Sequence, residues 1–397
     1  MLNPTITDRL YENILLFLVI ANLILAFIFS PFIGKLNSIH YLSGTLTILA
    51  TCWMLPTVFF SRCFKYFDFI FLSTVFYYLV IAAWYVMFGV ELNEVIRAYL
   101  SFLYLPMFAL ICSRLSKHQL KTILLALFTL GFFVALMVIP FFIQLIQAKL
   151  SYNRFTAYLD ITHTPIFIII LPLCFLLLSK FKYYFVAIVI VAIFATQSKG
   201  QVLMALLVLL ACEIVSNKAS LVHSLKVVSL IFLCSLPTTF FNGSTDDLSS
   251  KNPANRLGDL RGDTTIHRVK EILLAKEYAL KNPIFGVGPT TEFHIRGIAT
   301  SENNPRQRYI HNVVMYFLAT GGVVGFLVYI APYFTVLIGG INSKENKLLL
   351  ISILGSFGYL LVSATFKSIQ TNMFLGVLIG CSIVYSGVGC SPKKTDG

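Results

Sequence analysis

Long apolar runs with few charges recur along most of this chain, and they limit its fold more than any other feature. Hydrophobic residues make up 57% of the sequence and charged residues 12%, whereas soluble domains are about 45–50% apolar and about 25% charged. Each run approaches the roughly 20 apolar residues that a helix needs to cross a bilayer. The runs are continuous and do not alternate with polar residues, which favours helices over a membrane β-barrel. We therefore predict an all-α polytopic membrane protein.

The apolar runs predict about twelve transmembrane helices in a single integral membrane domain over residues 1–397. The spans are expected near residues 13–34, 41–60, 67–90, 95–112, 120–145, 162–180, 183–198, 200–216, 221–241, 309–339, 347–366 and 370–388. A long polar segment, residues 242–308, separates the ninth span from the tenth. We expect this segment to form a large, partly helical loop.

Lysine and arginine residues in the short loops predict the orientation, because they concentrate on the cytoplasmic side. With the N-terminus inside, the inner set holds fourteen of them: Arg9, Arg62, Lys65, Arg114, Lys117, Lys121, Lys180, Lys182, Lys218, Lys226, Lys344, Lys347, Lys393 and Lys394. The outer set holds six: Lys35, Arg97, Lys149, Arg154, Lys199 and Lys367. This excess predicts that both termini are cytoplasmic and that the 242–308 loop faces outward. The net charge of +13 is interpreted mostly as anchoring at the inner face, and nucleic-acid binding is not expected.

The cysteines and histidines show no metal-binding pattern. The eight cysteines are scattered, mostly in apolar runs and without a C-x-x-C pair, where cysteine packs as a small hydrophobe. The seven histidines are dispersed and lack the spacing of a zinc site. We predict neither a metal nor a cofactor.

The outer loop carries a helical pattern with a clear stop signal. Residues 264–280 show the spacing of a helix, and Asn282-Pro283 ends it. On this helix Arg268 falls on one line with Ile272, Ala275 and Ala279, which predicts that Arg268 points toward another part of the protein. Two interpretations are open. The arginine snorkels or pairs with a carboxylate, or its planar guanidinium binds an anion such as phosphate.

Three further residues at predicted outer positions could join Arg268. Lys199 lies in the short turn Thr196-Gln-Ser-Lys199-Gly200, Arg154 lies in the loop before the sixth span, and His163 stands where that span begins. Ionisable groups at a membrane boundary commonly act as interfacial anchors. Together they would instead make one outer mouth of the protein cationic.

His311 and the glycines that follow it stand where the outer loop meets the tenth span. A neutral imidazole can accept a proton from a hydroxyl group, which makes His311 a candidate general base. The alternative is an ordinary hydrogen-bonded histidine at the interface. Gly321, Gly322 and Gly325 would let another helix pack closely, and simple helix packing is the favoured interpretation for them.

The order and spacing of these motifs resemble a known family. His311-Asn312, nine residues, Gly322, two residues and Gly325 look like the His-[Asn/Ser/Gln]-x9-Gly-x-x-Gly signature of bacterial O-antigen ligases and related O-antigen polymerases. Upstream, Arg268 followed by fourteen residues and Pro283-Ile-Phe-Gly286-Val-Gly288 is similar to another conserved stretch of that family. The Lys199-Gly200 turn occupies the place of the family's Ser/Thr-Arg-Gly turn. The resemblance covers roughly residues 150–330.

The resemblance implies a glycosyltransferase of the bacterial inner membrane with its active site facing the periplasm. Its donor would be a glycan on undecaprenyl diphosphate, and its acceptor a sugar hydroxyl of lipid A-core. His311 would correspond to the family's essential histidine, which activates the acceptor. Arg268 would correspond to the arginine that holds the diphosphate, with Lys199 and Arg154 as further cationic contacts and Asn312 and His163 in support. Besides these substrates, only membrane lipids are expected as partners.

Two departures from the family pattern accompany the resemblance. Lys199 stands where the family usually has arginine, which keeps the charge but loses the bidentate fork. Many members carry an acidic residue near the penultimate span, whereas residues 363–370 hold none.

Several other functions are also considered. The same donor would serve an O-antigen polymerase, whose acceptor is a second lipid-linked repeat; the ligase is favoured because its His motif fits without a gap. Twelve spans also suit a transporter or flippase, yet no inverted repeat and no convincing acidic residue in the middle of a span is seen. A non-catalytic scaffold would leave the loop motifs unexplained.

Overall fold

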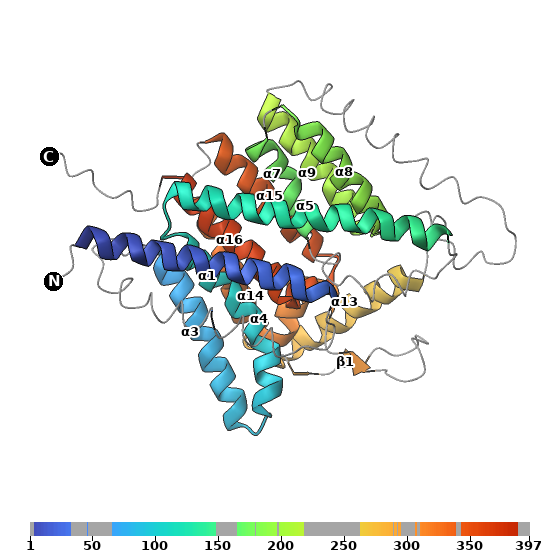
Figure 1. Cartoon of the computed structure of the whole chain (residues 1–397). Coiled ribbons are helices and arrows are strands. Elements are labelled where there is room, and N and C mark those ends of the chain that lie inside the picture. Colours follow the sequence, from blue (N-terminus) through green and yellow to red (C-terminus); the bar gives the residue numbers. More distant parts are fainter. Residues whose placement is uncertain are drawn as a thin grey trace, which may run out of the picture.

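The computed structural model describes residues 4–32, 46, 66–147, 165–178, 180–196, 198–217, 263–288, 290–291, 293–294, 306–307, 310–338 and 343–387. These residues form helices almost throughout, and Figure 1 shows their arrangement. The helices are α1 (Pro4–Phe32), α3 (Tyr66–Met87), α4 (Leu92–Cys112), α5 (Lys117–Gln147), α7 (Ile166–Leu177), α8 (Lys182–Ala195), α9 (Lys199–Asn217), α13 (Asp263–Lys281), α14 (Val313–Ile338), α15 (Lys344–Leu360) and α16 (Ile369–Tyr385). A short 3-10 helix, η2 (Ala364–Lys367), joins α15 to α16.

Two short strands are the remaining elements of the described part. β1 (Phe293–His294) and β2 (Arg306–Gln307) pair antiparallel, with Phe293 opposite Gln307. Both belong to the predicted outer loop, which therefore contains a small ribbon besides its helix. The prediction of a wholly helical protein is otherwise confirmed for the residues described.

The helices agree with most of the predicted spans. Ten of the twelve expected spans coincide with helices of the structure, and the two near 41–60 and 221–241 fall on residues that, apart from residue 46, lie outside the described part. Four helices, α3, α4, the segment Lys117–Pro140 of α5 and α14, are long and apolar enough to cross a membrane by themselves. Others, such as α7 and α8, are apolar but shorter. The total of twelve therefore stays a prediction.

The last helix, α16, lies at the centre of the bundle. Its residues from Gln370 to Ile383 are all buried, and Figure 1 shows α16 between α4 and α15. Gly376 and Gly380 face the backbone of α4, where an added Cβ would press on the Leu105 and Ala109 carbonyl oxygens. Small residues let two membrane helices approach this closely, because packing and not water exclusion drives their association in lipid.

α14 is interrupted at Gly322, and a segment of the outer loop fills the interruption. Gly322 has φ 63° and ψ −163°, so Val323 and Val324 cannot reach the carbonyl groups four residues earlier, as they would in a continuous helix. Their N–H groups donate instead to the carbonyl oxygens of Pro283 and Ile284, at 2.8 and 3.2 Å.

The two carbonyl groups freed on the other side of the break are also occupied. Val287 N–H donates to Ala319 O at 2.9 Å, and Gly288 N–H donates to Thr320 O at 2.8 Å. Two hydrogen bonds of the helix are thus replaced by four to the 283–288 segment. Since buried main-chain groups must be paired, this exchange explains how a broken helix is tolerated here.

Glycine is required on both sides of this junction. Gly286 and Gly322 both have positive φ. A Cβ on Gly286 would overlap the Thr320 carbonyl group, and one on Gly322 would overlap that of Ile284. The predicted role of these glycines as contacts between two helices is therefore wrong for Gly322, whose neighbour is a loop and not a helix.

We predict that Gly322→Ala strongly destabilises the protein. The added methyl group would meet backbone atoms that cannot move without breaking the four hydrogen bonds. Gly89→Ala is the matched control, because Gly89 also has positive φ but nothing within 4 Å of the added Cβ, so it carries only the strain of about 1–2 kcal/mol. Thermal unfolding of the two purified variants would compare them, and equal losses would show that the close fit at Gly322 does not matter.

Candidate active site

His311 lies directly before α14 and is bound by a carboxylate of the outer loop helix. Its backbone N–H donates to Glu271 Oε2 at 2.9 Å, and its Nδ1 lies 3.0 Å from Oε1 and 2.9 Å from Oε2 of the same side chain. Glu271, on α13, is 1% exposed, whereas the side chain of His311 is 29% exposed. One buried carboxylate thus fixes both the main chain and the ring of His311.

This contact determines which ring nitrogen is available for chemistry. An ionised carboxylate can only accept hydrogen bonds, so in the neutral imidazole Nδ1 carries the hydrogen and donates to Glu271. The lone pair is then on Nε2, the nitrogen directed away from the carboxylate. A histidine held in this tautomer by a carboxylate can act as a general base.

Asn312 holds the same segment from the other side. Its Oδ1 accepts from the N–H of Met315 at 3.0 Å, which caps the first turn of α14. Its Nδ2 donates to the carbonyl oxygen of Leu361, just after α15, at 3.0 Å. Asn312 therefore fixes the chain next to His311.

Arg268 begins the same face of α13 that carries Glu271, one turn earlier, but its side chain is exposed. The predicted buried line of Arg268, Ile272, Ala275 and Ala279 is confirmed only at Ala275, which is fully buried; Ile272 is 37% exposed. Compared with the prediction, α13 is rotated about its own axis so that Glu271, and not Arg268, faces the protein interior. The contact with His311 makes the burial of this carboxylate possible. Residues three apart are neighbours on a helix, so Arg268 still lies beside the carboxylate that binds His311.

The structure describes only part of the predicted cationic group. Arg154 and His163 lie outside the described residues, and of Lys199 only the backbone, as the first residue of α9, is described. The start of α9 nevertheless packs on the end of α15, because a Cβ on Gly200 would meet the side chain of Val362. The neighbouring Leu361 bonds to Asn312. The backbone of Lys199 and the segment of His311 therefore belong to the same end of the bundle.

Sequence reasoning missed two residues of this region. Glu271 was not considered, although its position three residues after Arg268 placed it one turn along the same helix. Lys367 was counted only as an outer-face cation; its Nζ lies 4.4 Å from the ring centre of Tyr316, in α14. The neighbouring Phe366 also packs on Tyr316, with ring centres 5.0 Å apart. A cation thus lies at the first turns of α14, in the segment where the family pattern often has an acid.

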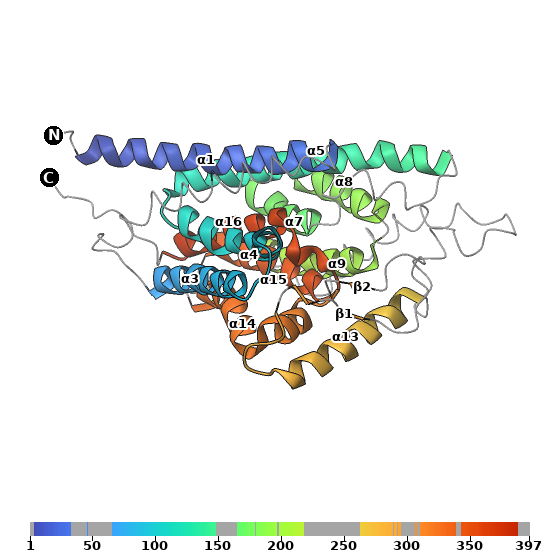
Figure 2. The same ribbon diagram turned by 90° about the horizontal axis from the view of Figure 1, so that it is seen from below.

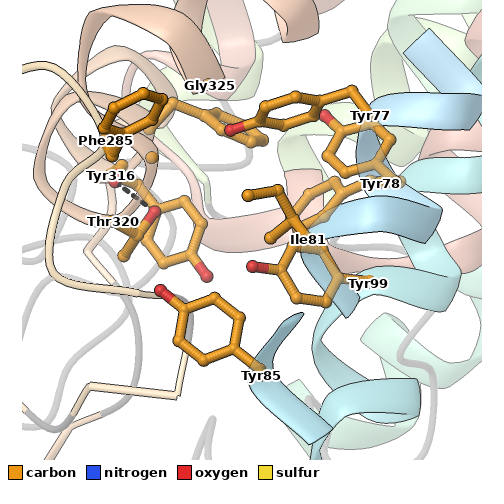
Figure 3. Close-up of a pocket in the computed structure, with 12 residues that line it drawn as sticks. Tyr77, Tyr78, Ile81, Tyr85, Tyr99, Phe285, Tyr316, Thr320 and Gly325 are labelled. Carbon is orange, nitrogen blue, oxygen red and sulfur yellow. Dashed lines mark hydrogen bonds between the residues drawn. The ribbon is translucent and has the colours of Figure 1, made fainter. Parts of the chain in front are cut away.

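A small pocket lined by tyrosines lies beside the junction of the loop with α14. It is bounded by α3, α4, α14 and the loop, and in Figure 3 the hydroxyl groups of Tyr85, Tyr99 and Tyr316 point toward one another. The cavity volume is about 30 Å³, and one water needs about 10–15 Å³. The pocket therefore accommodates about two waters and not a sugar ring.

Two buried hydroxyl groups lie beside this pocket. The hydroxyl oxygens of Tyr78 and Tyr316 have no hydrogen-bond partner among the residues that the structure describes. Buried polar groups without a protein partner are commonly satisfied by water.

The fold and the site define a polytopic helical membrane protein in which a loop helix and the start of a span bring a carboxylate and a histidine together. Residues 184–330 match the family model described as O-Antigen ligase. This stretch contains the candidate site residues Arg268, Glu271 and His311, and the match supports the O-antigen ligase family assignment made from the motifs. Comparison with curated proteins gave no match.

Proposed function

We propose that this protein is an O-antigen ligase that transfers a glycan from undecaprenyl diphosphate to a sugar hydroxyl of lipid A-core. The family match indicates a membrane enzyme of the O-antigen pathway with lipid-linked glycan substrates. The observation that carries the catalytic assignment is the contact of Glu271 with the ring of His311. We place the reaction on the periplasmic face of the inner membrane, with both termini in the cytoplasm.

In the proposed reaction His311 acts as general base. Nε2 accepts the proton of the acceptor hydroxyl while its oxygen attacks the anomeric carbon of the donor glycan. The bond from that carbon to the diphosphate oxygen breaks, and undecaprenyl diphosphate leaves with its electron pair. The carboxylate of Glu271 stabilises the imidazolium that forms. General base catalysis of this kind contributes about 10²–10⁴-fold.

The leaving diphosphate gains negative charge in the transition state, so cations nearby would lower the barrier. Arg268 is the best placed of the described residues, since it lies one turn from Glu271 on α13. Its exposure suits a group that must reach a substrate from solution or from the membrane surface. Lys199 and Arg154 remain predicted partners of the same diphosphate.

The related polymerase reaction uses the same donor and leaving group and differs only in the acceptor. The family covers both activities. Reconstitution of the purified protein in liposomes with a lipid-linked glycan, and separately with lipid A-core or a second lipid-linked repeat, decides between them. Product with lipid A-core alone supports the ligase; product with the repeat alone overturns it in favour of the polymerase, and transport of the lipid without a new glycosidic bond would contradict both.

We predict that His311→Ala abolishes glycan transfer while the protein still inserts and folds. Loss of the base removes the proton acceptor, whereas the fold retains the junction at Gly322. His118→Ala is the control, since His118 is exposed at the start of α5. Transfer would be followed in the liposome assay and folding by thermal unfolding; an active His311→Ala variant would rule out the base.

We predict that Glu271→Gln lowers kcat by about 10²–10³-fold with little change in KM. Glutamine can still accept from the backbone of His311, but it cannot stabilise the imidazolium. Glu277→Gln, at an exposed site on the same helix, should leave both constants unchanged. The pH profile of kcat should also change in the Glu271 variant alone; equal losses in kcat and stability without that change would indicate a structural role.

We predict that Arg268→Gln weakens inhibition by free undecaprenyl diphosphate. The substitution removes a charge that would bind the leaving group in substrate and product. Lys276→Gln, which removes a charge from an exposed position two turns further along α13, is the control. Competition by undecaprenyl diphosphate would be measured for both variants, and unchanged competition in Arg268→Gln would exclude the diphosphate contact.

A further inference from the structure

The turn that follows α13 lies beside α14 at about a third of its length and not beyond its end. Its residues Pro283 and Ile284 bond to Val323 and Val324 of α14. α14 has 26 residues, of which about 20 suffice to cross the hydrocarbon core of about 30 Å. Gly322 stands nine residues after Val313, which is about 14 Å along the helix.

This geometry puts the junction inside the hydrocarbon core for any placement of α14 along the membrane normal. α14 has 26 residues, about six more than the roughly 20 that cross the hydrocarbon core, and these six cover about 9 Å of helix. If all of them project at the His311 end, Gly322 lies about 5 Å inside the core; if all project at the other end, it lies about 14 Å inside. Pro283 and Ile284 of the turn bond to Val323 and Val324, so the turn lies at the same depth as Gly322.

The turn has the properties that such a position requires. Ile284 and Phe285 are 59% and 65% exposed, so both leave a large apolar surface uncovered, and Phe285 also borders the tyrosine pocket. Several main-chain groups of the turn are paired within the protein, through the four bonds to α14 and through Gly286 N–H, which donates to Asn282 O at 2.9 Å. Irregular backbone at membrane depth is tolerated where it is buried in protein or lines a water-filled cavity, and the four bonds to α14 pair the main-chain groups at the junction itself.

α13 continues the same apolar surface. On a helix with 3.6 residues per turn its residues fall into three sectors: a buried one around Glu271, Ala275 and Tyr278, a charged one with Lys270, Glu277 and Lys281, and an exposed apolar one. The exposed apolar sector consists of Val269, Ile272, Leu273 and Leu280. Lys276 lies within it, where a long stem can follow the apolar surface while the ammonium group reaches the headgroups.

The arrangement of the helices agrees with this interpretation. In Figure 1 α13 runs across the direction of α8 and α9, and Figure 2 shows it at the opposite side of the bundle from α1 and α5. Val323, Leu327 and Phe334 of α14 are also exposed apolar residues, and on a membrane-spanning helix they face lipid. The turn and α13 extend that lipid-facing surface.

We propose that α13 and its following turn are inserted in the membrane, in the leaflet at the His311 end of α14. The inserted surface is formed by Val269, Ile272, Leu273, Leu280, Ile284 and Phe285, and its partner is the acyl region of the bilayer. α13 is then an interfacial helix whose opposite side carries Glu271 to His311. This inference rests on the fold and holds whether or not the protein transfers glycans.

Tryptophan fluorescence tests the insertion, because the chain has only two tryptophans. In a background with Trp53→Phe and Trp84→Phe, single tryptophans would be placed by Phe285→Trp, Leu273→Trp and, as the matched control in the charged sector of the same helix, Glu277→Trp. The full-length proteins would be reconstituted in phosphatidylcholine vesicles with or without bromine on the acyl chains. Iodide in the buffer would report exposure to water.

We expect the brominated lipid to remove most of the emission of Phe285→Trp and Leu273→Trp but little of that of Glu277→Trp. Iodide should show the reverse order. The two apolar positions provide independent readings if one substitution disturbs folding. Equal quenching of all three variants by iodide, with no effect of bromine, would overturn the proposal and place α13 in the aqueous phase.

Discussion

The exchange of main-chain hydrogen bonds at Gly322 is the interaction on which the rest of the site depends. α14 gives up two bonds of its own helix and gains four to residues 283–288. A break in a membrane helix is costly unless the freed groups find partners, so the loop segment and the helix can only form this structure together. Because the segment directly follows α13, the same junction fixes the end of α13 against α14. Glu271, nearly three turns back from the end of α13, is thereby brought to His311, two residues before α14.

A buried carboxylate at this place needs a physical explanation. An ionised carboxylate away from water is strongly destabilising unless it is hydrogen-bonded, and Glu271 obtains its contacts from the backbone and the ring of His311. An apolar residue could fill the same space without that requirement, since replacing buried ionic contacts by apolar packing is often neutral for stability. The contact between Glu271 and His311 is therefore better explained by orientation of the imidazole than by stabilisation of the fold.

Much of the architecture could be predicted from the sequence, because apolar runs of helical length report burial in lipid directly. The positions of α3, α14 and α16 follow from such runs, and the spacing of His311 and the glycines indicates the family that the match over residues 184–330 supports. The buried face of α13 could not be predicted in this way. Its amphipathic pattern has apolar residues on the outward side, and the residue that decides its rotation, Glu271, is buried by a partner forty positions away. The break at Gly322 escaped prediction for a related reason: Gly-x-x-Gly suits close helix packing equally well, and only the loop residues opposite show that the helix opens.

His311 lies between two anchors, and this explains how a residue at a loop boundary can be held in a fixed position, as the proposed general base requires. On one side Glu271 binds its backbone and Nδ1; on the other, Asn312 caps α14 and bonds to Leu361 after α15. The first anchor depends on the loop, and the second on the packing of α15, whose end also meets the start of α9 at Gly200. The loop helix contacts His311 directly, the start of α14 fixes the chain next to it, and the start of α9 packs next to the residue to which Asn312 bonds. Their separation along the chain follows from this arrangement, since the loop helix, the turn before α9 and the start of α14 meet only in the folded bundle.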